Sequence, residues 1–156
     1  MDFDATYRQY GEMLYRIAFV YLGNSHSAED VLQDVFVTLF TNSLKFKSEE
    51  HRKAWLIRVT QNKCINYLKN PAHKMQDIED VQLPAQNDDD DTRLDVLKQI
   101  IALPPKYKSV VILYYYNDFS VDEIAKILKI GKSAVKMRLK RSRELLKIQL
   151  EDYIYE

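Results

Sequence analysis

The sequence predicts an all-α protein of two small helical domains joined by an acidic linker, and three observations lead to this fold class. Only 3 glycines and 4 prolines interrupt the 156 residues, too few for the many turns of a β-sandwich or barrel. Apolar residues recur at intervals of three and four, the period of a helix face. Between Pro71 and about Thr92 this periodicity gives way to a polar, acidic stretch, which predicts a flexible linker.

The first two helices are predicted before residue 41. From Asp4 to Leu22 one helix face is marked by an apolar repeat, namely Tyr7, Tyr10, Leu14, Ile17 and Tyr21. Gly23 and Asn24 are expected to end this helix, and Ser27 is expected to cap the next one, which runs to about Phe40. The second helix carries two adjoining apolar stripes and is therefore expected to bury a wide face, made of Val31, Leu32, Val35, Phe36, Leu39 and Phe40.

A third helix is predicted from Ser48, a capping residue, to Asn70, because Pro71 disfavours helical geometry in the residue before it. One face is apolar and expected to be buried: Leu56, Ile57, Cys64, Tyr67 and Leu68. The opposite face suits stacking on unpaired bases and contact with phosphates: Trp55, Arg58, Asn62, Asn66 and Lys69. A tryptophan there is as well suited to closing the core, so this face alone leaves both interpretations open.

Charge is divided unevenly along the chain, although the formal net charge is zero. Residues 70–103 carry 3 Lys and Arg against 8 Asp and Glu, a net charge of −5. Residues 104–150 carry 11 Lys and Arg against 4 Asp and Glu, a net charge of +7. The basic segment is therefore the candidate for binding a polyanion.

The second domain is predicted to begin with helices at Arg93–Leu103 and Lys106–Tyr116, separated by Pro104-Pro105. The second of these helices ends in three consecutive tyrosines, residues 114–116. Tyrosines can stack on bases, but in a helix that precedes a DNA-binding motif they more often belong to the core, and a core position is expected.

A helix-turn-helix motif is predicted next. Ser120 and Glu123 match a capping box, in which each side chain satisfies a free amide at a helix start. Residues 129–131 form a break of the right length for a tight turn that contains glycine. Ser133 is expected to cap a last helix that runs to about Lys147.

This last helix combines a narrow apolar stripe with a broad basic surface. The stripe, which must pack on the domain, is Val135, Leu139, Ser142 and Leu146. The cations are Lys136, Arg138, Lys140, Arg141, Arg143 and Lys147. The first residues of such a helix reach base edges in the major groove, here Ser133, Lys136 and Met137, and more distant cations hold the phosphate backbone. A merely solvated basic face is the alternative, but it leaves the capped turn unexplained.

The order of these motifs resembles an extracytoplasmic-function (ECF) sigma factor of the sigma-70 family. The resemblance covers nearly the whole chain. It is carried by Ser-Ala-Glu-Asp-Val-Leu-Gln-Asp-Val-Phe at 27–36, Trp-Leu at 55–56 with Asn62 seven residues after the tryptophan, the acidic linker, and Leu-Pro-Pro at 103–105 ahead of the helix-turn-helix.

The resemblance implies a non-catalytic subunit of bacterial RNA polymerase. Residues 1–71 would be sigma region 2, residues 72–92 the linker near the active-centre channel, and residues 93–156 sigma region 4. The partners implied are core polymerase, through its beta-prime clamp helices and beta flap, promoter DNA and an anti-sigma factor. The second helix would face the clamp helices through Glu29, Asp30, Gln33 and Asp34.

By the same resemblance, the third helix and the loop before it would capture the melted minus-ten element. Asn62 is then expected to touch a flipped-out base, assisted by Trp55, Arg58, Asn66 and Lys69. The last helix would read the minus-thirty-five element as duplex through Ser133, Lys136, Met137, Arg138, Lys140 and Arg141. Asn66 and Lys69 stand where the family usually has aspartate and arginine, which leaves the geometry of this surface open.

Three other classes of function compete with this interpretation, and the first is a purely structural helical adaptor, which an absence of DNA binding would favour. A stand-alone helix-turn-helix regulator would need neither the polar stacking face nor the acidic face of the first domain. An enzyme would need clustered nucleophiles, bases or metal ligands, yet His26, His51 and His73 are scattered, and no phosphate-binding glycine loop is present. No cofactor is therefore expected. A single cysteine and the lack of a long apolar run predict a cytoplasmic protein that does not insert into membranes.

Overall fold

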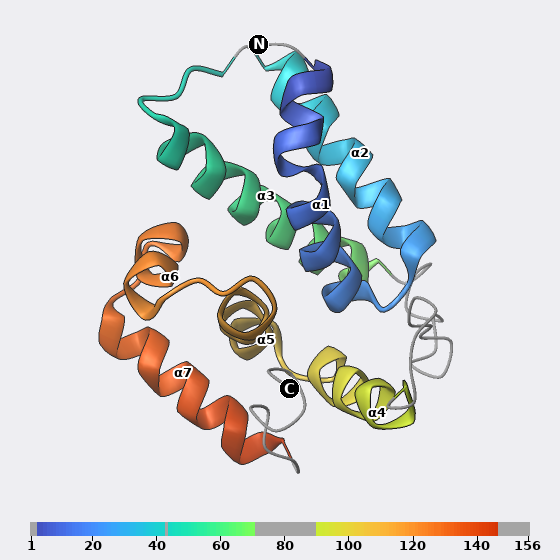
Figure 1. Ribbon diagram of the computed structural model, residues 1–156, viewed down its shortest axis with the longest axis vertical. Helices are drawn as coiled ribbons and strands as arrows, with labels where there is room; N and C mark the ends of the chain where they lie inside the picture. Colours follow the sequence, from blue (N-terminus) through green and yellow to red (C-terminus); the bar gives the residue numbers. More distant parts are fainter. Residues whose placement is uncertain (1–2, 43, 71–89, 147–156) are drawn as a thin grey trace.

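The computed structural model describes residues 3–42, 44–70 and 90–146, and every regular element in these ranges is helical. Figure 1 shows two bundles, one above the other. The N-terminal bundle consists of α1 (Phe3–Leu22), α2 (Ser25–Thr41) and α3 (Glu49–Lys69). The C-terminal bundle consists of α4 (Asp90–Ile101), α5 (Pro105–Val111), the π-helical turn η3 (Ile112–Tyr116), α6 (Val121–Leu128) and α7 (Lys132–Leu145). The all-α prediction is confirmed for the described residues.

The N-terminal bundle forms because each helix buries the stripe that its periodicity predicted. Leu14, Ile17 and Tyr21 of α1 are fully buried, as are Val35 of α2 and Leu56 of α3. These side chains meet along the bundle axis, and the opposite sides of the three helices stay polar and exposed. Each of the three helices therefore keeps one side in the core and one side in solvent.

The start of α2 differs from the prediction. The cap is Asn24, whose side chain accepts a hydrogen bond of 2.9 Å from the backbone N–H of Ser27. Ser27 lies inside the helix, is buried and shares a hydrogen bond with the hydroxyl of Tyr67. Asn24 and Ser27 are both residue types that favour the N-cap position. Asn24 takes this position because the chain turns out of α1 at Gly23, which has a φ of 73°.

The C-terminal bundle contains the predicted helix-turn-helix as α6 and α7. The capping box is present, with Ser120 Oγ accepting from the N–H of Glu123 at 3.1 Å and Glu123 Oε1 accepting from the N–H of Ser120 at 2.9 Å. The turn lies where it was predicted, at residues 129–131, and Lys129 takes the left-handed conformation there, with a φ of 58°. Ser133 is not the cap of α7; that position is Gly131, which makes no side-chain bond.

The end of the linker also differs from the prediction. α4 begins at Asp90, so residues 90–92 are helical and not linker, whereas residues 72–89 lie outside the described residues. The predicted helix at 93–103 therefore starts three residues earlier and ends at Ile101. Among the tyrosines at the end of the next helix, Tyr115 is buried and its two neighbours are half-buried, which confirms a core position.

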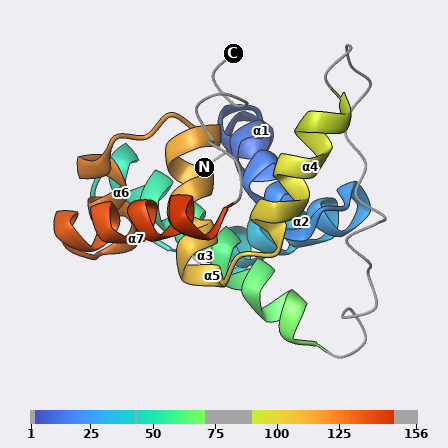
Figure 2. The same ribbon diagram turned by 90° about the horizontal axis from the view of Figure 1, so that it is seen from below.

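The two bundles pack against each other in the structure, as the view from below also shows (Figure 2). The buried apolar side chains form one continuous cluster that runs from Tyr10 in α1 to Leu146 after α7. α5 and η3 lie beneath α1, and α6 lies against α3. The placement of the second bundle therefore decides which parts of α3 are accessible.

Candidate nucleic-acid interface

The basic surface of the C-terminal bundle lies on α7. Its stripe of Val135, Leu139 and Ser142 is buried, as predicted, and holds the helix against the bundle. One of its cations also braces the helix, because Arg143 Nε donates a hydrogen bond of 2.6 Å to the hydroxyl of buried Tyr115. The outer side of the helix is thus fixed in direction before any ligand binds.

The outer side of α7 presents the predicted contact residues to solvent. Met137 is 71% exposed, more than any other large apolar side chain whose burial the structure describes. Ser133, Lys136, Lys140 and Arg141 are exposed and Arg138 is half-buried. Arg141 is held to Glu144 at 3.0 Å in an exposed pair. A helix that projects several cations and an exposed apolar residue suits the phosphates and base edges of a DNA groove.

The polar face of α3 is only partly open. Asn62, Asn66 and Lys69 are exposed at the C-terminal half of the helix. Trp55 is half-buried, with its ring 5.6 Å from that of Phe46 in the preceding loop. Arg58 is half-buried and donates a hydrogen bond of 2.8 Å to the backbone oxygen of Ile127 in α6. Three of the five predicted residues therefore lie at the surface, and the other two contact other residues of the protein.

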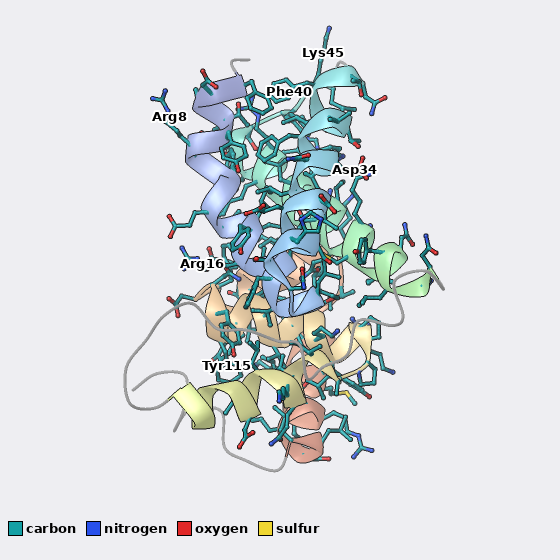
Figure 3. The ribbon with its side chains drawn as sticks, turned by 90° about the vertical axis from the view of Figure 1, so that its right-hand side faces the viewer. Arg8, Arg16, Asp34, Phe40, Lys45 and Tyr115 are labelled. Atoms are coloured by element: carbon teal, nitrogen blue, oxygen red, sulfur yellow. The ribbon has the colours of Figure 1, made fainter. Side chains whose placement is uncertain are left out.

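The loop before α3 carries an aromatic cluster that the sequence analysis did not identify. Phe46 packs against His51 at 5.4 Å and lies beneath the guanidinium of Arg52 at 5.7 Å. His51 Nδ1 accepts a hydrogen bond of 3.1 Å from the backbone N–H of Lys47. The signal in the sequence was a phenylalanine between two lysines, and its partners lie five to nine residues further on, beyond the reach of a local pattern. Lys45 of this loop projects away from the bundle (Figure 3).

The acidic face lies on α2, where Glu29, Asp30, Gln33 and Asp34 are all exposed. The four residues form a ridge between two shallow grooves. Glu29 and Gln33 line the groove toward α1, together with Tyr7 and Tyr15. Asp30 and Asp34 line the groove toward α3, together with Lys63 and Asn66. Asp34 pairs with Lys63 at 3.0 Å, and Figure 3 shows it on the opposite side of the bundle from Arg8 and Arg16.

Other classes of site find no support in the described parts of the chain. Within residues 3–42, 44–70 and 90–146, no group of three or more His, Cys, Asp and Glu side chains is arranged to hold a metal ion. None of the described helices is long and apolar enough to cross a bilayer. Cys64 is fully buried, and burial raises the pKa of its thiol well above the ordinary value, so it suits packing and not chemistry.

Comparison with known proteins matches both halves of the chain. The family model described as sigma-70 region 2 matches residues 6–73, and the model described as sigma-70, region 4 matches residues 93–146. The ECF RNA polymerase sigma factor SigW of Bacillus subtilis is 31% identical over 92% of this chain and 86% of its own length. The RNA polymerase sigma factor SigV of the same organism is 28% identical over 87% of this chain and 83% of its own.

A solved structure shares the arrangement of the helices. The sigma factor RpoE of Bartonella quintana, in a co-crystal with the anti-sigma factor NepR, aligns with a TM-score of 0.70 over 99% of this chain and 97% of its own. The two sequences are 23% identical, so this likeness speaks for the fold.

Proposed function

This chain belongs to the ECF sigma factors of the sigma-70 family, and from that premise we propose how its surfaces divide the work of promoter recognition. As a sigma factor it binds core RNA polymerase and directs promoter-specific transcription initiation. One observation supports the assignment of a separate promoter element to each domain. Two faces suited to nucleic acid, one on α3 and one on α7, belong to two different bundles. We propose residues 1–71 as the first domain and the residues from Asp90, where α4 begins, to 156 as the second, with the linker between them.

The exposed face of α2 is the proposed contact with core polymerase. Glu29 and Gln33 point toward one groove and Asp30 and Asp34 toward the other, so a pair of helices in the beta-prime subunit could lie over the ridge. Carboxylates in two shallow grooves favour a basic partner surface, and polar rims around an apolar centre are usual in such interfaces.

The exposed part of α3 is the proposed contact with the melted minus-ten element. Asn62 carries an amide that can both donate and accept hydrogen bonds, which suits the edge of an unpaired base. Asn66 and Lys69 lie further along the helix, where an amide and a cation can hold the adjoining backbone. Trp55 and Arg58 belong to the same face, with Trp55 supported from behind by Phe46.

The first turns of α7 are the proposed reader of the minus-thirty-five element as duplex DNA. Ser133, Lys136 and Met137 are exposed at the start of the helix, where the motif places residues against base edges. Arg138, Lys140 and Arg141 would neutralise phosphates, which makes binding strongly salt-dependent.

The role is that of a non-enzymatic initiation factor, and no catalytic step is assigned to any residue. It is exercised in the bacterial cytoplasm, where polymerase and chromosome are found. An anti-sigma factor is a further proposed partner, because the co-crystallised RpoE was solved with one. The beta flap of polymerase is the proposed contact for the C-terminal bundle.

The test is transcription with purified protein and bacterial core RNA polymerase on genomic DNA, with mapping of the transcript starts. We expect starts that share two spaced elements, that are lost with Asn62→Ala, and that are lost with the pair Lys136→Ala and Arg138→Ala. Arg16→Ala, which removes an exposed cation on α1, is the control and should leave the starts unchanged. Binding to duplex DNA without any association with polymerase would instead identify a stand-alone helix-turn-helix regulator.

A further inference from the structure

One exposed apolar side chain lies at the centre of the outer side of α7. Met137 is 71% exposed, whereas Phe3 and Tyr7, which are exposed on α1, stack on each other with ring centres 5.9 Å apart. At about 100° per residue, Met137 lies about 160° around the helix from Val135 and from Leu139. Those two residues are buried, so Met137 points away from the core, and the packing of the bundle does not explain a methionine here.

The surroundings of Met137 distinguish it from the scattered apolar residues that any protein surface carries. Lys136 and Lys140 are displaced from it in one direction around the helix, by about 100° and about 60°. Arg138 and Arg141 are displaced in the other direction, by about 100° and about 40°. Both lysines and Arg141 are exposed, and Arg138 is half-buried. Met137 is therefore an apolar centre between two pairs of cations.

The far end of α7 has a different character. Glu144 is the only carboxylate of this helix, and it pairs with Arg141 at 3.0 Å. Leu145 follows it and is 43% exposed. Since a carboxylate repels phosphate, this end is less suited to a polyanion than the segment around Met137.

The major groove of a DNA duplex offers an apolar side chain one partner among the base edges. Guanine, adenine and cytosine present hydrogen-bond donors and acceptors there, whereas thymine adds a C5-methyl group. A thioether chain placed against donors and acceptors would remove them from water without replacing their hydrogen bonds, which costs free energy. The methyl group has no hydrogen bond to lose, and the long unbranched chain of methionine can adapt to its position.

We propose that Met137 selects thymine within the minus-thirty-five duplex by packing its side chain against the C5-methyl group. The cations on either side hold the phosphates that border the groove, so the methionine between them is directed at the base edges. The same contact disfavours a G·C pair at that position, because polar atoms of that pair would be left without partners. The assignment rests on the proposed function of α7 and adds specificity for one base to it.

A protein partner is the alternative occupant of this surface. Exposed methionines also occur in protein interfaces, but the centres of such interfaces are depleted in charged residues. Met137 has four cations within four residues of it along the chain, which favours a polyanion. Uracil substitution in the DNA separates the two occupants, since no protein contact depends on the methyl group of a base.

The experiment measures the affinity of the holoenzyme for a promoter duplex, taken from a mapped transcript start, at one fixed salt concentration. Each thymine of the minus-thirty-five element, on either strand, is replaced in turn by deoxyuridine, which lacks only the C5-methyl group. One position should lose affinity by about four-fold, the effect expected for the removal of one buried methyl group. Cytosine at that position should bind more weakly still, and 5-methylcytosine should recover part of the loss.

Three variants assign this preference to a side chain. Met137→Gln keeps the length of the chain and removes its apolar character, and because Met137 is exposed the variant should fold like the wild type. It should bind the thymine and uracil duplexes equally, and this non-additive effect identifies a direct contact. Met137→Leu stays apolar and should retain most of the preference for thymine. Leu145→Gln, the matched change at the far end of α7, should retain all of it.

The proposal is overturned if no thymine shows a uracil effect, or if the effect is equal in the wild type and Met137→Gln. It is also overturned if Met137→Gln weakens the association with core polymerase, which would identify a protein contact. Lys136→Ala separates this inference from the proposed function. If it lowers affinity while uracil has no effect, α7 contacts the duplex and only the thymine assignment fails. If neither change alters affinity, α7 does not read the element and its proposed function fails as well.

Discussion

The guanidinium of Arg58 and the backbone oxygen of Ile127 form a hydrogen bond of 2.8 Å between residues 69 positions apart. One side chain thus belongs both to the proposed minus-ten face and to the contact that holds the bundles together. We expect Arg58→Ala to lengthen the distance between the bundles in the free protein. The same change should weaken promoter binding by the holoenzyme by about ten-fold, since a hydrogen bond to a charged group contributes about 1.5 kcal/mol or more.

Arg52→Ala is the matched control for this prediction. Arg52 bonds to Glu49 within α3 at 2.7 Å, and its guanidinium lies 5.7 Å from the centre of the Phe46 ring in the preceding loop. Its removal should leave unchanged the distance between the bundles, measured in the free protein with spin labels on cysteines introduced at the exposed positions Gln9 and Leu145. An equal lengthening in both variants would mean that Arg58 acts through the stability of α3.

The capping box at the start of α6 should contribute measurably to stability. Ser120→Ala removes the oxygen that accepts from the N–H of Glu123, and should lower the free energy of unfolding by about 1 kcal/mol. Ser133→Ala is the comparison, because that serine caps nothing and should cost much less. Urea unfolding followed by circular dichroism measures both, and equal losses would contradict the assignment of the caps.

The cations of α7 should determine the salt dependence of DNA binding. Replacing Lys136 with alanine removes one proposed phosphate or base contact, and should lower affinity for a promoter duplex and reduce the slope of log affinity against log salt by about one. Titrations of the holoenzyme at several salt concentrations measure the slope. Arg16→Ala removes a cation from the far bundle and should leave it unchanged; a slope insensitive to Lys136 would exclude this residue from the interface.

Asp34 should contribute more to polymerase binding than to folding. Its ion pair with Lys63 spans 3.0 Å, but the Asp34 side chain is 62% exposed, so the pair should contribute less than about 1 kcal/mol to stability. Asp34→Asn should therefore fold normally and lower the affinity for core polymerase severalfold in a pull-down titration. Glu12→Gln, an exposed carboxylate of α1, is the control, and a similar loss there would indicate a general charge effect.

Tyr10 should make stability depend on pH in the alkaline range. Its hydroxyl donates to Glu49 Oε2 at 2.5 Å, and burial, followed by this hydrogen bond to a carboxylate, raises its pKa to about 12. Because the folded pKa lies above the ordinary value near 10, the contribution is complete below about pH 10 and is lost as pH rises toward 12. The stability difference between wild type and Tyr10→Phe, about 1 kcal/mol at pH 8, should therefore vanish by pH 12.

The sequence predicted the helices well because the signals were local. The apolar stripes of α1, α2 and α3 repeat within a few residues, and burial confirms them at Leu14, Val35 and Leu56. The box at Ser120 and the stripe of α7 were likewise predicted and found. The caps at Ser27 and Ser133 were wrong, since several neighbouring residues had capping chemistry and only the path of the chain between helices selected Asn24 and Gly131.

The residues of the candidate site on α3 were predicted from the sequence, but their exposure to solvent was not. Helical spacing places Trp55, Arg58 and Asn62 on one face, whatever surrounds them. Which of them meets solvent depends on the loop that brings Phe46 to Trp55 and on the bundle that brings Ile127 to Arg58. Neither Phe46 nor Ile127 can be identified as a neighbour from the sequence of α3.

The fold class, the faces of each helix and the order of motifs that identifies the family follow from the amino-acid sequence alone, because each of these arises from residues within one or two helical turns. The packing of the two bundles on each other, and the burial of Lys108 beside Tyr21, 87 positions away, are visible only in the folded chain. Contacts of that separation depend on the sum of many weak packing terms across two surfaces, and no periodicity or motif of a single helix encodes that sum.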